Sequence, residues 1–170
     1  MTLPASFPIS MSQIATELGL SLPLSINHPW VITLAGKSAL PVSFSDLLDR
    51  SGRYDGSALA QSTGGQFPTI YATLYPAMMF GGTLSTIGSN NAPGNVWTLT
   101  ISFSAPPTPG VFPPHWSGNL EVTNNTTNTS FVLTQTSTYV WSITQTSASN
   151  PYANVVRLGQ TDSFTILPST

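Results

Sequence analysis

The stretch Trp97-Thr98-Leu99-Thr100-Ile101-Ser102-Phe103-Ser104 alternates large apolar residues with small polar ones without a break. Successive side chains of a β-strand point to opposite faces of the sheet, so this period of two is typical of a strand with one buried face. The stretch Tyr139-Val140-Trp141-Ser142-Ile143-Thr144 follows the same pattern. The surrounding sequence therefore predicts a mainly β domain.

Similar short runs recur from residue 66 onward, separated by segments rich in proline, glycine and asparagine. Such segments form turns, and many short strands separated by turns favour an antiparallel β-sandwich, Ig-like or jelly-roll-like, over residues 66–170. A small β-barrel is the alternative. We expect strands at 69–75, 79–84, 96–104, 119–123, 130–135, 138–145, 154–158 and 163–167.

Charged residues are scarce and unevenly placed. They make up 6% of the chain, against about 25% in an ordinary soluble domain. Seven of the ten precede residue 57, so the surface of the C-terminal region consists of uncharged polar and apolar groups. A surface with so little charge does not keep copies apart, which favours obligate assembly and a homo-oligomer. The seven are Glu17, Lys37, Asp46, Asp49, Arg50, Arg53 and Asp55.

Several function classes lose support from composition. No cluster of Lys and Arg provides an electrostatic footprint for nucleic acid, and no apolar run is long enough for a membrane-spanning helix. The first eight residues do not resemble a signal peptide. Cysteine is absent and the two histidines have no ligand spacing, so we expect neither metal nor cofactor. No nucleophile motif is present, and we expect no enzyme activity.

One short motif occurs twice within residues 1–56. The copies are Pro8-Ile9-Ser10-Met11-Ser12-Gln13-Ile14, followed by Gly19, and Pro41-Val42-Ser43-Phe44-Ser45-Asp46-Leu47, followed by Gly52. Each predicts a short helix with Ser12 or Ser45 as its N-cap and the glycine in the left-handed conformation at its C-terminus.

A partial third copy, Leu24-Ser25-Ile26-Asn27, lies between the other two. It predicts a helix over 28–35 that Asn27 caps and Gly36 ends.

Helices this short are unstable in isolation. We therefore predict a docking arm at 1–56, a linker at 57–65 whose small polar residues suit either flexibility or close contact with a neighbouring chain, and the β-domain at 66–170. The apolar face of the arm is expected to be buried on a partner. The residues predicted to bind the partner are Ile9, Met11, Ile14, Leu18, Ile26, Trp30, Val42, Phe44, Leu47 and Leu48.

The order of the motifs over residues 8–54 resembles the N-terminal region of tailed-bacteriophage virion proteins. Their openings contain Ile-Ser-Phe-Ser-Gln-Ile, Ile-Ser-Leu-Asn and Ile-Ser-Met-Ser-Asp-Leu in that order. The resemblance covers under a third of the chain, which departs from the pattern at His28-Pro29-Trp30. It implies a structural component of the virion, of the tail above all, assembled in the bacterial cytoplasm with other virion proteins as partners.

Two alternative functions remain open from the sequence. One is a capsid decoration protein, and the other is a carbohydrate-binding or receptor-binding module for a host-surface glycan. Aromatic side chains in loops stack on sugars, and Trp116 and Tyr152 lie in expected loops. These two residues are therefore the candidates for ligand contact.

Overall fold

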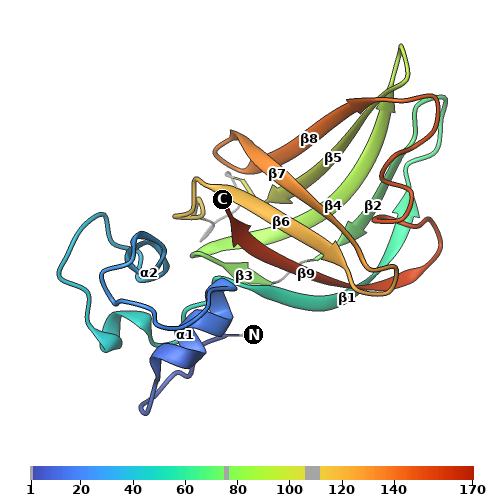
Figure 1. Cartoon of the computed structure of the whole chain (residues 1–170). Helices are drawn as coiled ribbons and strands as arrows, with labels where there is room; N and C mark the ends of the chain where they lie inside the picture. The colour runs from blue at the N-terminus through green and yellow to red at the C-terminus, as the bar shows by residue number, and fades with distance from the viewer. Residues whose placement is uncertain (1, 75–76, 106–111) are drawn as a thin grey trace.

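The computed structural model of the chain describes residues 2–74, 77–105 and 112–170, and its main body is a closed antiparallel β-barrel (Figure 1). Eight strands form the ring in the order β2-β1-β9-β6-β7-β8-β5-β4, and β4 pairs with β2 to close it. A two-residue strand, β3 (Met78–Met79), pairs with β4 outside the ring. The ring strands are β1 (Tyr54–Ser62), β2 (Thr69–Thr73), β4 (Gly82–Ala92), β5 (Val96–Phe103), β6 (Asn119–Asn124), β7 (Thr129–Ser137), β8 (Val140–Thr146) and β9 (Thr161–Ser169).

The prediction of a mainly β fold is confirmed, but the architecture is a barrel and not the expected sandwich. The difference arises at β2. Ala72 of this strand pairs with Ala60 of β1 on one side and with Ile87 of β4 on the other. A sandwich would leave strand edges open at this point, whereas a barrel removes edges altogether. These pairings join distant segments, which a local pattern does not reveal.

Three expected segments differ in the structure. Residues 57–62, expected in the linker, belong to β1, where Ala58 and Ala60 point inward and are buried. The expected strand 79–84 is wrong at its start, because a turn at residues 80–81 separates β3 from β4. Strand β4 begins at Gly82 and extends to Ala92, and an irregularity between Leu84 and Thr86 shifts its register. Such a bulge interrupts the period of two, which hides a long strand from a pattern search. The last residue of the expected strand 69–75 lies outside the described residues.

The third segment that differs from the prediction is 154–158, which forms turns and no strand. Two of its apolar residues are buried because the loop before β9 folds back onto the barrel, whereas Leu158 is 55% exposed. Val155 and Val156 are fully or almost fully buried. The Asn124 side chain, from the end of β6, donates to the Val155 carbonyl at 2.9 Å and to the Asp162 carboxylate at 2.9 Å. Asp162 is also paired with Arg157 of the same loop, which lowers the pKa of this buried carboxyl.

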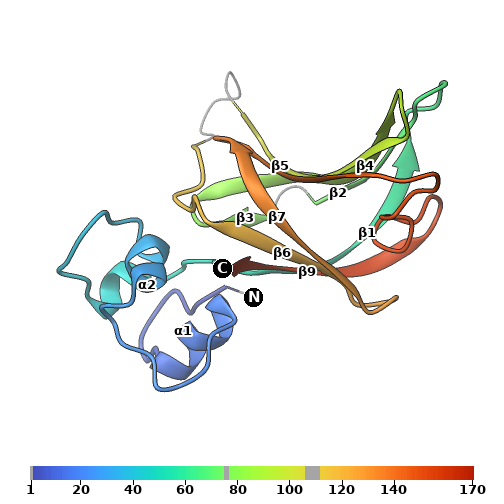
Figure 2. The same cartoon turned by 45° about the horizontal axis from the view of Figure 1, so that its top comes forward.

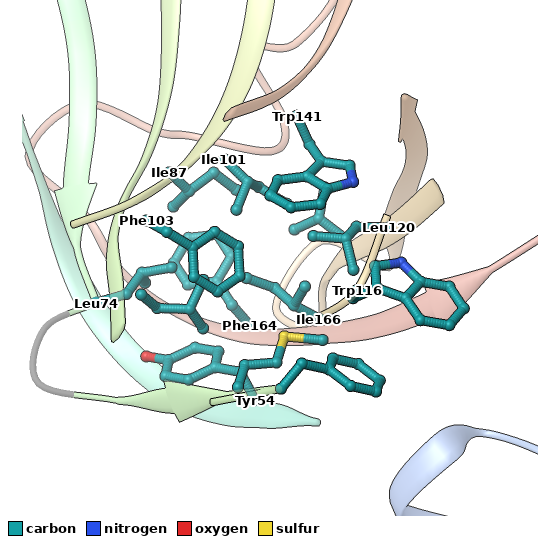
Figure 3. Close-up of a cluster of buried hydrophobic side chains, with 14 of the residues drawn as sticks. Tyr54, Leu74, Ile87, Ile101, Phe103, Trp116, Leu120, Trp141, Phe164 and Ile166 are labelled. Atoms are coloured by element: carbon teal, nitrogen blue, oxygen red, sulfur yellow. The ribbon is translucent and has the colours of Figure 1, made fainter. Parts of the chain in front are cut away.

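The barrel interior is filled by side chains from nearly every strand, including the alternating apolar residues that the sequence predicts to face inward. Leu99 and Ile101 of β5 and Trp141 of β8 are fully buried. Figure 3 shows that they belong to a larger cluster of aliphatic and aromatic side chains. The labelled members are Tyr54, Leu74, Ile87, Ile101, Phe103, Trp116, Leu120, Trp141, Phe164 and Ile166.

Residues before β1 form three short helices that pack beside the end of β9 (Figures 1 and 2). They are α1 (Met11–Leu18), α2 (Pro29–Leu34) and the 3₁₀-helix η1 (Phe44–Leu47). The predicted helices are thus present, with caps shifted from their expected positions. Ser10 and Ser43 are the N-caps of α1 and η1 instead of Ser12 and Ser45, because their side chains complete capping boxes three residues further on.

The other helix ends also differ in part from the prediction. His28 caps α2 in place of Asn27, since its Nδ1 accepts from the backbone N–H of Trp30 at 3.2 Å. The left-handed conformation of Gly19 at the end of α1 is confirmed. Gly52 does not adopt it, and Asp49 takes the positive φ near the end of η1.

Gly52 is the point where the helices and the barrel meet. A Cβ atom on Gly52 would lie 3.1 Å from Leu18 of α1, 3.1 Å from Phe80 and 3.2 Å from Leu34 of α2. All three side chains are buried and belong to the same apolar cluster as the barrel interior. The N-terminal segment therefore shares one core with the barrel.

Replacement of Ile101 by alanine should lower the free energy of unfolding by about 2–5 kcal/mol, because the side chain is fully buried and its loss leaves a cavity. Urea denaturation followed by tryptophan fluorescence measures the change. The matched control is Thr100→Ala on the outward face of the same strand, for which we expect a change within about 0.5 kcal/mol. Equal losses for the two variants would contradict the assigned inward and outward faces.

Candidate docking surface

The two copies of the sequence motif have the same local geometry. The backbone N–H of Ser10 donates to Gln13 Oε1 at 2.8 Å, and the backbone N–H of Ser43 donates to Asp46 Oδ2 at 2.8 Å. In both copies the serine hydroxyl also donates to the same side-chain oxygen, at 3.0 Å in the first copy and 2.8 Å in the second. The sequence repeat therefore corresponds to a repeated local structure, in which the apolar residues that flank each cap have equivalent surroundings.

The structure divides the residues predicted to bind a partner into two groups. Ile14, Leu18 and Leu47 are fully buried by the chain's own residues. The others are partly exposed and lie around these three at the surface of the N-terminal segment. This partly exposed group is Ile9, Met11, Ile26, Trp30, Val42, Phe44 and Leu48.

Three large apolar side chains that the sequence reasoning missed are far more exposed. Phe7 is 59% exposed, Leu22 56% and Leu40 50%. Each directly precedes a proline, namely Pro8, Pro23 or Pro41, at the start of one copy of the motif. The signal that could have found them is the motif itself, extended toward the N-terminus by one residue in the two full copies and by two residues in the partial copy.

We call Phe7, Leu22 and Leu40 the apolar triad. Each member is followed, two residues later, by a half-buried aliphatic side chain that packs against the core. The chain that follows each triad member is thus anchored to the core, while the side chain of the member itself is exposed to solvent. Single exposed apolar residues are common on protein surfaces, whereas the same exposure at three equivalent positions of a repeat indicates a shared role. The aliphatic residues are Ile9, Leu24 and Val42.

Trp116 and Tyr152, the candidates for ligand contact, are buried. Trp116 is 5% exposed and donates from its indole N–H to the Asn119 carbonyl at 2.8 Å. Tyr152 is fully buried and donates its hydroxyl proton to the Ile143 carbonyl at 3.1 Å. Neither ring offers a free face for a sugar, because both rings pack within the protein.

Trp116 instead connects the N-terminal segment to the barrel. Its ring stacks on Phe80 with centroids 5.1 Å apart, and Trp30 of α2 meets it edge-on at 5.1 Å. Aromatic pairs at such distances contribute about 0.5–1.5 kcal/mol beyond their buried area. The structure therefore brings together one predicted partner residue and one predicted ligand residue, as parts of a packing contact.

Glu17 is a charged side chain buried between α1 and the start of β1. It is completely inaccessible, and its Oε1 accepts from the Gly52 N–H at 2.9 Å, the Arg53 N–H at 3.0 Å and the Ser51 hydroxyl at 3.1 Å. Its Oε2 has no hydrogen-bond partner among the described residues. Burial raises the pKa of Glu17 above its usual value, and the hydrogen bond from Gly52 opposes that rise.

Two ion pairs lie at the surface of the same segment. Lys37 Nζ is 2.8 Å from Asp46 Oδ2, and its hydrogen bond lowers the pKa of that carboxyl to about 2. Arg53 pairs with Asp55 of β1, which lowers the pKa of the Asp55 carboxyl to about 2. Over residues 2–74, 77–105 and 112–170, no three potential ligands among His, Asp and Glu gather around a metal position. In the same ranges, no helix has the length and apolar character needed to cross a membrane.

Neither a family model, nor a curated protein, nor a solved structure matches the chain.

Replacement of Glu17 by alanine should lower the free energy of unfolding by about 2–4 kcal/mol, since the N–H groups of Gly52 and Arg53 lose their acceptor and the Ser51 hydroxyl loses one acceptor while it keeps the Arg53 carbonyl. Chemical denaturation at pH 7 measures the loss. Glu121→Ala is the matched control, because Glu121 makes no ion pair within the described part of the chain and is only partly buried. A loss no larger than that of the control would show that the Glu17 contacts contribute nothing.

The pH dependence of stability gives a second test of Glu17. Its pKa in the folded state lies above the reference value of 4.5, so the stability that its protonation contributes is complete below pH 4.5 and is lost as the pH rises through the folded-state pKa, while the hydrogen bonds that its Oε1 accepts remain. The unfolding free energy of the wild-type chain, relative to that of Glu17→Gln, should therefore fall between pH 4.5 and pH 7. The other carboxyl groups are present in both proteins, so their contributions cancel in the difference between the two unfolding free energies. A constant or rising difference would contradict the raised pKa.

Proposed function

We propose that the chain is a structural protein of a tailed-bacteriophage virion, a tail component at the tip, an adaptor or a fibre attachment, whose N-terminal segment docks on neighbouring subunits. The observation that carries this proposal is the apolar triad, three large exposed side chains at equivalent positions of one repeat. The resemblance of residues 8–54 to tailed-phage virion proteins supports the proposal that the chain is part of a virion.

Three equivalent contacts suit a partner that presents equivalent sites. Full burial of one Phe or Leu side chain contributes about 1.5–3 kcal/mol, which alone gives weak binding. When three such side chains belong to one chain, binding of the first raises the effective concentration of the others. Weak contacts then combine into stable attachment, and we propose that the sites are supplied by a symmetric or repetitive assembly.

The barrel wall is suited to close packing in such an assembly. Five strands that are adjacent around the ring, β2, β4, β5, β8 and β7, contain no charged residue at all. Interface centres in proteins are depleted of charge because charged groups lose their hydration there. Copies of this wall can therefore approach one another without like-charge repulsion, in agreement with a homo-oligomer inside the particle.

The test is the incorporation of a triple variant, Phe7→Ser, Leu22→Ser and Leu40→Ser, into particles made from a genome that encodes it. We expect incorporation to fall at least about tenfold, because each substitution removes apolar area from the interface. Quantitative mass spectrometry of purified particles measures it. Thermal unfolding checks that the variant is folded.

A triple control, Leu59→Ser, Phe67→Ser and Leu158→Ser, removes side chains that are 44–55% exposed on the barrel. It should be incorporated normally. Particles that lack the wild-type chain would refute the virion function, and normal incorporation of the first variant would refute docking through the triad. Labelling of heads instead of tails in electron micrographs would replace the tail assignment by capsid decoration.

A further inference from the structure

A hollow of about 480 Å³ opens on the N-terminal segment beside the C-terminal end of α2. Pro29 and Ile32 contribute apolar lining, and the remaining lining includes polar and cationic side chains. The lining residues are Pro29, Ile32, Thr33, Gly36, Lys37, Ser38 and His115.

The His115 ring is seated between two glycines. A Cβ atom on Gly36 would lie 3.0 Å from the Cε1 atom of His115, and a Cβ atom on Gly81 would lie 3.0 Å from the same atom. Both glycines have positive φ, 71° and 79°, which side chains other than glycine rarely adopt. The backbone N–H of His115 donates to the Phe80 carbonyl at 2.8 Å. The imidazole is thus held against the backbone, with its remaining surface toward the hollow.

Arg50 reaches the same place from the other side. Its Nη1 lies 3.8 Å from the position that a Cβ atom on Gly36 would take. Its Nε donates to the backbone carbonyl of Asp46 at 3.2 Å, which fixes the direction of the guanidinium. The guanidinium group and the imidazole therefore both lie close to Gly36, which lines the hollow.

Arg50 differs from the other cationic side chains of the chain in having no carboxylate partner. Lys37 is paired with Asp46, Arg53 with Asp55 and Arg157 with Asp162, whereas Arg50 makes no ion pair within the part of the chain that the structure describes. The exposed carboxylate of its chain neighbour, Asp49, does not pair with it there. One positive charge thus remains uncompensated beside the hollow. A guanidinium presents parallel N–H groups that match the two oxygens of a carboxylate.

We propose that this hollow receives a Glu or Asp side chain from a neighbouring protein subunit, with Arg50 pairing with the carboxylate and the wall at Pro29 and Ile32 covering an apolar residue beside it. The inference rests on the docking function proposed above and names the chemistry of the partner. It adds a polar, orienting contact to the apolar ones of the triad, since ion pairs fix the register of an interface more than its strength.

The test uses the full-length chain, labelled with nitrogen-15, and N-acetyl-Leu-Glu-amide as the probe in NMR titrations. We expect saturable shifts of the Arg50 Nε–H signal and of the Gly36 and Gly81 amides. Binding of N-acetyl-Leu-Gln-amide should be at least about tenfold weaker, because the charge is lost. Equal affinity for the two dipeptides, or no saturable shift, would overturn the proposal. Inorganic phosphate binding more tightly than the Glu probe would overturn it as well.

The matched variants are Arg50→Gln and Arg53→Gln, and the dispersion of their NMR spectra reports that each is folded. The first should lose binding of the Glu probe, whereas the second retains it because Arg53 already has its partner in Asp55. Binding unaffected by Arg50→Gln would overturn the assignment. If purified particles contain the chain and the probe does not bind, only this inference fails. If no particles contain the chain, the proposed virion function is refuted, and the NMR titration remains an independent test of carboxylate binding in the hollow.

Discussion

The buried contact of Glu17 with the Ser51 hydroxyl and with the backbone N–H groups of Gly52 and Arg53 holds the N-terminal segment against the barrel. It lies next to Gly52, where side chains from α1, α2 and the β3–β4 turn come within 3.1–3.2 Å of the position that a Cβ atom would take. A polar and an apolar constraint thus act at the same point. Since burial raises the pKa of the Glu17 carboxyl, the contact has a cost that its three donors offset. This attachment also fixes the position of the surface of the N-terminal segment that faces away from the barrel.

The consequence for function is that the proposed docking residues are presented by a folded surface. The helices pack their buried faces toward the barrel, through Ile14, Leu18 and Leu47, and the loops between the helices face outward. Leu22 and Leu40 occupy those loops, and Phe7 lies in the segment before α1. A partner that binds them therefore need not supply the ordering of the segment, which avoids most of the entropy loss of a disordered arm.

Charge is used sparingly, and mostly to join neighbouring segments. Lys37–Asp46 ties the loop after α2 to η1, Arg53–Asp55 stiffens the start of β1, and Arg157–Asp162 supports the loop before β9. Because the chain has so few charged residues, each ion pair leaves fewer unpaired charges at the protein surface. The unpaired guanidinium of Arg50 and the uncharged barrel wall follow from the same scarcity, and both are suited to contacts with other proteins.

The sequence by itself determined the strands with strong alternation, such as β5 and β8, and the presence of three capped helices, because these depend on local periodicity and local hydrogen bonds. It did not reveal β1, whose small inward residues resemble a linker, or the turns at 154–158, whose valines are buried by a folded-back loop. Only the tertiary structure decided the closure of the barrel at β2, the burial of Trp116 and Tyr152, and the exposure of the triad. Each of these depends on which distant segments come into contact, and the free energy of such contacts is shared between residues that no local pattern connects.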